Sequence, residues 1–208
     1  MRLVPRQARF ALSDPLRDTI RRGYAAQVSD PEAARWFAGA LPRNEGEAAF
    51  LASLRASAAA WRVAGVTPES TRSLSVINPL YVECRVPDLP PGSSLDSVLQ
   101  VGYLWDPVDP TLLGEWDSEN YLLDGASGTD ILNVVGIAAS PVLFGEWTAD
   151  WIWRQLQRPV ERVEFLGRRG EELGTEWRLA DSLRSLGTTG HWWQRRRAAD
   201  RCVVRVRG

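Results

Sequence analysis

In the first third of the chain, apolar residues recur three or four positions apart, which is the spacing of one face of an α-helix. A first helix is predicted to begin at Ser13, a capping residue, because an apolar series follows it: Leu16, Ile20, Tyr24 and Val28. A second helix is predicted over 29–42, where a capping serine, a proline and acidic residues stand at the start. A third is predicted over 44–65, with a single apolar face: Phe50, Leu51, Leu54, Ala58 and Trp61.

Beyond residue 70 apolar and polar residues alternate, which is typical of half-buried β-strands. A long strand is predicted over 73–86, with Asn78-Pro79 as a break, a bulge or an edge feature. Further strands are predicted over 98–105, 131–139, 160–166, 177–183 and 201–207. Helical spacing returns near 148–157, where four apolar residues share one face: Trp147, Trp151, Ile152 and Leu156.

This order of elements predicts an α+β fold in a single domain over 1–208, with N-terminal helices packed on a mainly antiparallel or mixed sheet. Residues 1–67 would form the helical layer, and residues 70–208 would form the sheet together with the helix near 148–157. Hydrophobic residues make up 44% of the chain and charged residues 25%, as in ordinary globular proteins. A chain of 208 residues buries a core of useful size without disulfides.

All 25 basic residues are arginine, and with the abundant alanine, glycine and proline this indicates a GC-rich bacterial genome. The N-terminus has no apolar leader segment, and the longest weakly polar run, 134–144, is too short to cross a bilayer. We therefore expect a cytoplasmic protein without membrane contact. Cys84 and Cys202 have no metal-binding spacing, so two free, buried thiols are favoured over a single bridge. The ten tryptophans fit a core and an interaction surface equally well.

Charge is distributed unevenly along the chain. Residues 1–86 carry 12 arginines and 8 acids, residues 87–150 carry 11 acids and no arginine, and residues 151–208 carry 13 arginines and 7 acids. A net charge of -1 therefore hides three blocks of alternating sign. Such segregation favours separate charged surfaces, which steer association with partners of opposite charge.

The acidic block contains the residues that we name as candidate partner-binding positions: Asp106, Asp109, Glu115, Asp117, Glu119, Asp124 and Asp130. They are compatible with a docking surface for a basic protein, with a metal or acid–base site, and with a solvated face that complements the chain's own arginines. If 115–119 is a strand, its three acids lie on one side and Trp116 on the other. A row of like charges is stable only when it faces water or cations, which favours docking.

His191 is the only histidine, so a multi-histidine metal site is excluded. Any serine or cysteine nucleophile that needs a histidine base would have to use His191. Cys84 stands in an apolar, strand-like register, so we expect it to be a buried structural thiol. Residues 191–197 combine rings and cations, which gives a nucleic-acid-binding alternative through Trp192, Trp193, Arg195, Arg196 and Arg197. An exposed basic turn with its tryptophans in the core is the simpler interpretation, because the acidic block would repel a polyanion.

The chain has no P-loop, no GxGxxG, no HExxH and no nucleophile elbow, so no cofactor is expected. Three functional hypotheses follow. The favoured one is a non-catalytic protein-interaction module (an immunity-type inhibitor, adaptor or assembly component) that binds a basic protein through its acidic surface. The second is a carboxylate-based or metal-assisted enzyme that uses the 106–130 block. The third is a single-stranded nucleic-acid binder that uses 191–197.

Overall fold

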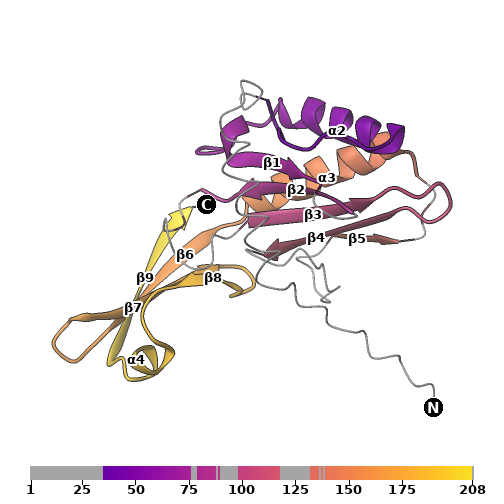
Figure 1. Ribbon diagram of the computed structural model, residues 1–208. Helices are drawn as coiled ribbons and strands as arrows, with labels where there is room; N and C mark the ends of the chain where they lie inside the picture. The colour runs from indigo at the N-terminus through magenta and orange to yellow at the C-terminus, as the bar shows by residue number, and fades with distance from the viewer. Residues whose placement is uncertain are drawn as a thin grey trace, which may run out of the picture.

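The computed structural model describes residues 35–75, 79–87, 89, 98–117, 132–135, 137 and 139–207, without the side chains of Asp117 and Trp192. The described part contains three α-helices and two antiparallel sheets, which confirms the predicted α+β class (Figure 1). The helix predicted after Ser13, and the start of the one predicted over 29–42, lie outside the described residues.

The larger sheet is a meander in which each strand pairs antiparallel with the next, in the order β1-β2-β3-β4-β5. Its strands are β1 (Thr71–Leu74), β2 (Leu80–Arg85), β3 (Val98–Leu104), β4 (Thr111–Asp117) and β5 (Leu132–Val135). A short 3-10 turn, η2 (Pro68–Ser70), leads into β1. Each strand therefore pairs with the strand that precedes or follows it in the sequence, which antiparallel pairing permits without a crossover.

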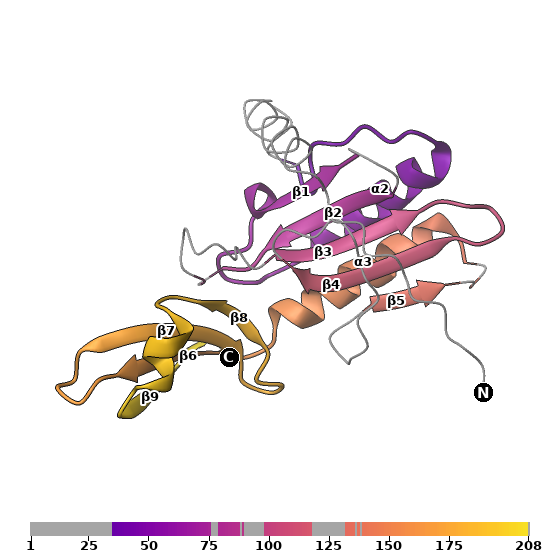
Figure 2. The same ribbon diagram turned by 60° about the horizontal axis from the view of Figure 1, so that its bottom comes forward.

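Two helices, α2 (Glu45–Ala58) and α3 (Pro141–Leu156), lie side by side and cover one face of this sheet (Figures 1 and 2). Asn44 caps α2, because its side chain accepts a hydrogen bond from the backbone N–H of Glu47 at 2.8 Å. Ser140 caps α3 in the same way, and a proline at the first helical position fixes the backbone for the helix.

The core fills the space between the helices and the sheet. Phe50 of α2 stacks on Tyr103 of β3 with ring centroids 4.2 Å apart. On the same face of the sheet, the indole N–H of Trp116 in β4 donates to the side-chain oxygen of Gln155 in α3 at 2.8 Å. These contacts show that odd residues of β3 and even residues of β4 face the helices.

The smaller sheet follows α3 and extends away from the first sheet (Figure 1). Its order is β8-β7-β6-β9, from β6 (Val160–Leu166), β7 (Glu172–Leu179), β8 (Ser185–Thr188) and β9 (Asp200–Arg207). A short helix, α4 (Trp192–Arg196), connects β8 to β9. Val160 of β6, Leu179 of β7 and Leu186 of β8 belong to the same apolar cluster as the first sheet, whereas the buried Val163 and Phe165 of β6 lie outside it.

Four local predictions are corrected. The strand predicted over 73–86 is two antiparallel strands, β1 and β2, joined by a connection that includes Pro79. Residues 35–41, predicted to continue a helix, are not helical, because Ala40 donates its backbone N–H to Ser73 at 3.0 Å along the edge of β1. The helix predicted near 148–157 begins earlier, at Pro141. The strand predicted over 131–139 ends at Val135.

Candidate functional site

The turn between β3 and β4 presents an apolar side chain between two carboxylates. Val108 is 85% exposed, and Asp106 and Asp109 are exposed on either side of it. The Asp106 Oδ1 atom accepts hydrogen bonds from the backbone N–H of Val108 at 2.7 Å and of Asp109 at 3.0 Å. This side-chain-to-backbone closure fixes the turn, so Val108 is held outward rather than folded onto the sheet. We call Asp106, Val108 and Asp109 the acidic turn.

The acidic turn keeps its charge available. The hydrogen bonds from the backbone of Asp109 and of Val108 hold the pKa of Asp106 below its usual value, so this carboxylate is ionised at neutral pH. Within the described residues, neither Asp106 nor Asp109 pairs with an arginine of this chain. The third sequence interpretation, a face satisfied by the chain's own arginines, therefore does not describe this turn.

The rest of the predicted acidic surface divides into two groups. Glu115 is 7% exposed, so of the two settings expected for its row, water or cations, it does not face water. A strand at 115–119 was considered only as a condition, and β4 covers the first part of that stretch, where it turns Trp116 toward the helices and Glu115 to the opposite face. The structure does not describe the side chain of Asp117 or any part of Glu119, Asp124 and Asp130.

Glu115 belongs to a buried polar row that crosses the sheet on the face away from the helices. The register places Arg72, Glu83, Gln100 and Glu115 directly opposite one another on β1 to β4. Glu83 accepts a hydrogen bond from the Arg72 Nε–H and another from the Gln100 amide at 2.9 Å. The row is thus a network in which the Glu83 carboxylate is occupied by its neighbours, while Oε1 of Gln100 has no hydrogen-bond partner.

Among the described side chains of the 106–130 block, which the enzyme alternative uses, Glu115 is the buried carboxylate. Glu83 and Glu115 lie two strands apart, which separates their Cα atoms by about 10 Å. No group of three or more histidine, cysteine, aspartate or glutamate side chains within the described ranges is arranged to hold a metal ion. Sequence reasoning missed the row, because the partners of Glu115 come from strands whose order the sequence leaves open.

The thiols and the histidine have different surroundings. Burial raises the pKa of the Cys84 thiol to about 12, so it stays protonated and is a poor nucleophile. Both cysteines are free, but Cys202 is exposed on β9, so the expectation that both thiols are buried is wrong for Cys202. His191 is exposed at the start of α4, where its ring stacks on Trp193 with centroids 5.9 Å apart.

The 191–197 segment forms α4 and its ends. Trp193 is 43% exposed, so the prediction that it is tucked into the core is wrong. Its ring is contacted by His191 and, at 5.5 Å, by the guanidinium of Arg197. Arg195 lies over Phe165 at 5.8 Å, and Arg196 is exposed. The Trp193 ring is therefore occupied by contacts with His191 and Arg197 of the same segment rather than left open as a stacking platform.

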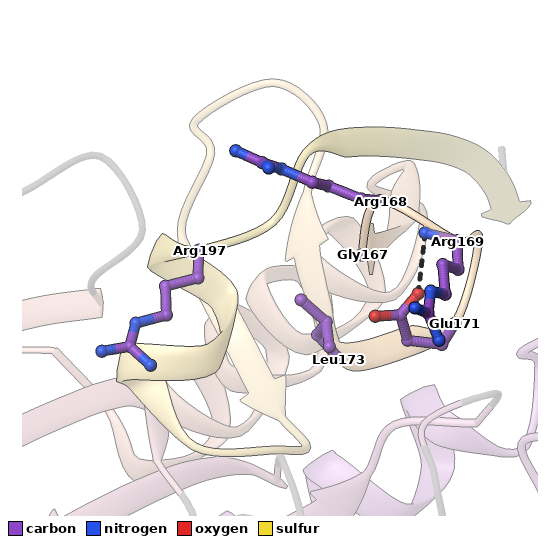
Figure 3. A pocket seen from close by; sticks show the side chains of 6 residues that line it. All are labelled: Gly167, Arg168, Arg169, Glu171, Leu173 and Arg197. Atoms are coloured by element: carbon purple, nitrogen blue, oxygen red, sulfur yellow. Dashed lines mark hydrogen bonds between the residues drawn. The ribbon is translucent and has the colours of Figure 1, made fainter.

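An open hollow of about 650 Å³ lies beside this segment, between the β6–β7 turn and the end of α4 (Figure 3). Its lining is Gly167, Arg168, Arg169, Glu171, Leu173 and Arg197. Glu171 accepts a hydrogen bond from the backbone N–H of Arg169 at 3.0 Å, which places a carboxylate inside the hollow. The three arginine side chains point in different directions (Figure 3), so they do not converge on one anion.

Comparison of this chain with protein-family models, with curated proteins and with solved structures finds no match. Within the part of the chain that the structure describes, no helix is long and apolar enough to cross a membrane. The functional argument therefore depends on the geometry of the chain itself.

Proposed function

We propose that this chain is a non-catalytic protein-interaction module that binds a partner with a basic surface through the acidic turn. An immunity-type inhibitor, an adaptor or an assembly component fits this description. The observation that supports the proposal most is Val108, 85% exposed between Asp106 and Asp109, which have no arginine partner among the described residues. We also propose a cytoplasmic location, as the sequence predicts.

The physical case is one of preorganisation. A turn whose shape is already fixed by its own hydrogen bonds loses little conformational entropy on binding. An exposed apolar residue supplies area to bury, and ionised carboxylates around it speed association with a cationic surface and disfavour anionic competitors. The acidic turn thus has a central apolar contact and a charged rim, as protein interfaces do.

The two alternatives receive less support from the same geometry. The enzyme alternative uses the 106–130 block, and the buried carboxylate described there, Glu115, lies in a row whose Glu83 carboxylate is bonded to Arg72 and Gln100. The nucleic-acid alternative uses 191–197, where the Trp193 ring is already contacted by His191 and Arg197.

The test is retention of a basic partner from cells in which the protein is native. Tagged parent protein is compared with an Asp106→Asn/Asp109→Asn variant, which removes two charges from the acidic turn. A matched control, Glu146→Gln/Asp150→Asn, removes two charges from exposed positions on α3. We expect the parent and the control to retain the same basic protein and the turn variant to lose it. Equal retention by all three would contradict the proposal.

A further inference from the structure

The second candidate surface is the open edge of the smaller sheet. β9 is the last strand of that sheet and pairs with β6 alone, so its outer side pairs with no strand of the described ranges (Figure 2). Every residue from Asp200 to Arg205 is exposed, so this stretch is left open by the part of the chain that the structure describes. An uncovered edge strand offers a row of backbone N–H and C=O groups to another strand.

The side chains of β9 are unusual for an unprotected edge. Val203 is 51% exposed and Val204 is 41% exposed, and as successive strand residues they lie on opposite faces of the sheet. Natural edges are blunted by short length, proline, charged side chains or bulges. This one carries arginines, but it has eight residues, no proline, and apolar surface on both faces, which a partner strand would cover.

Charge distinguishes the two faces of β9. Arg201 and Arg205 share the face of Val203, and the register places Arg205 opposite Glu161 on β6. The Glu161 carboxylate bonds Arg178 at 3.1 Å, and no ion pair joins it to Arg205 within the described residues. The other face carries the uncharged Cys202 and Val204, with Asp200 at the start of the strand. The strand that complements the stretch from Arg201 to Arg205 therefore has carboxylates on one face and apolar side chains on the other.

A second copy of this chain does not meet that requirement. Antiparallel pairing of two β9 strands in one continuous sheet requires a two-fold axis perpendicular to the sheet, so residues of one face meet the same face of the other copy. The face of β9 that carries Arg201, Val203 and Arg205 has no carboxylate, so no register of two β9 strands places one opposite these arginines. With Val203 opposite Val203, Arg201 also lies directly opposite Arg205 of the other copy at both ends. Like charges directly opposite each other destabilise a strand pair.

We propose that the open edge of β9 binds an extended acidic segment of another protein as a fifth strand, with acidic and apolar residues alternating along that segment. Backbone hydrogen bonds would supply affinity, and the pairing of its carboxylates with Arg201 and Arg205 would fix register and face. This surface is separate from the acidic turn and takes a partner of opposite charge.

The test uses the full chain and a fluorescent, end-blocked peptide of alternating glutamate and valine, measured by anisotropy. Two further peptides carry N-methyl groups on either all glutamate or all valine nitrogens, which blocks one edge of the peptide and leaves its charge unchanged. We expect the parent peptide to bind and one methylated peptide to bind at least about tenfold more weakly, because only one edge faces β9. Equal binding of all three would show simple charge attraction, and absence of binding by the parent peptide at low salt would likewise overturn the proposal.

Protein variants locate the site. Arg201→Glu changes an exposed side chain that lies opposite Phe165 rather than opposite a carboxylate, so we expect the fold to be preserved and peptide binding to be about tenfold weaker. Arg169→Glu makes the same charge change on the β6–β7 turn and should leave affinity nearly unchanged. Equal losses in the two variants would contradict the β9 site, as would dimerisation of the parent protein that Arg201→Glu alters. Asp106→Asn/Asp109→Asn should leave peptide binding unchanged, so this result and that for the acidic turn are separable.

Discussion

The contact between α2 and α3 gives a quantitative prediction about the layer that supports the sheet. Gly145 of α3 lies against the backbone of α2, where an added methyl group would be 2.6 Å from the Phe50 carbonyl oxygen and 3.0 Å from the Leu54 amide nitrogen. Ordinary contact begins at 3.4 Å, and the obstacle is helix backbone that no rotamer change can move. Gly145→Ala must therefore separate the helices and loosen the Phe50–Tyr103 stack below them.

Two effects of opposite sign decide the result. Alanine is favoured over glycine inside a helix by about 1 kcal/mol. Overpacking a well-filled contact costs about 1–3 kcal/mol, and backbone contact places this case in the upper part of that range. We expect the free energy of unfolding of Gly145→Ala to fall by about 1–2 kcal/mol in urea denaturation, with an unchanged m value. The control Glu146→Ala, exposed on the same helix, should change it by less than about 0.5 kcal/mol. A Gly145→Ala protein as stable as the parent would refute the close helix crossing.

Two further predictions concern buried ionisable groups. The Cys84 pKa lies at about 12 in the folded chain against an ordinary 9.0, so above pH 9 the unfolded state alone loses its proton. The free energy of unfolding should then fall as pH rises, and the fall should be steeper in the parent than in Cys84→Ala by up to about 1.4 kcal/mol per pH unit. Curves of unfolding free energy against pH that run parallel in the two proteins would contradict this. Glu83→Ala removes the carboxylate that Arg72 and Gln100 bond, and should lower the free energy of unfolding by about 3 kcal/mol. This is the lower end of the range for a broken buried pair, because Arg72 retains access to water. Asp181→Ala breaks a pair whose carboxylate is 46% exposed and should cost less than about 1 kcal/mol, so equal losses would count against the buried network.

The elements with a clear period were predictable from the sequence. Residues 160–166 were predicted as a strand and form β6 with those bounds, and 98–105 differs from β3 by one residue. In both segments apolar residues are bounded by turn signals, so local pattern and tertiary structure agree. The helix from Asn44 was also predicted, because a capping residue stands directly before an apolar face.

Errors arose where two interpretations of one pattern compete. The run 134–144 is weakly polar throughout, yet Ser140-Pro141 starts a helix inside it, and that capping signal was passed over in favour of a helix near 148–157. Residues 35–41 have helix-like composition, but the backbone around Phe37 and Ala40 bonds to Thr71 and Ser73 of β1 instead. These long-range hydrogen bonds override local propensity, and the sequence alone does not reveal them.

The candidate surfaces were only partly predictable. Asp106 and Asp109 were named from their charge, but exposure of Val108 depends on an Asx-type closure that Asp-Pro-Val-Asp could have indicated. Glu115 was named for the same reason and is buried, because its position in the polar row depends on the register of four strands. β9 was predicted as a strand, but its place at the edge depends on the order of strands in the sheet, which periodicity does not encode.

The most direct measurement is site-specific photo-crosslinking in cells from position 108. Val108 is replaced by p-benzoylphenylalanine, and Leu41, 81% exposed elsewhere on the molecule, is replaced in a parallel control. We expect the probe at position 108 to form one discrete adduct with a basic protein, and the probe at position 41 not to form this adduct. The adduct from position 108 should disappear when Asp106 and Asp109 are changed to asparagine. Adducts that are the same from both positions, or that persist after the carboxylates are removed, would contradict an interaction module built on the acidic turn.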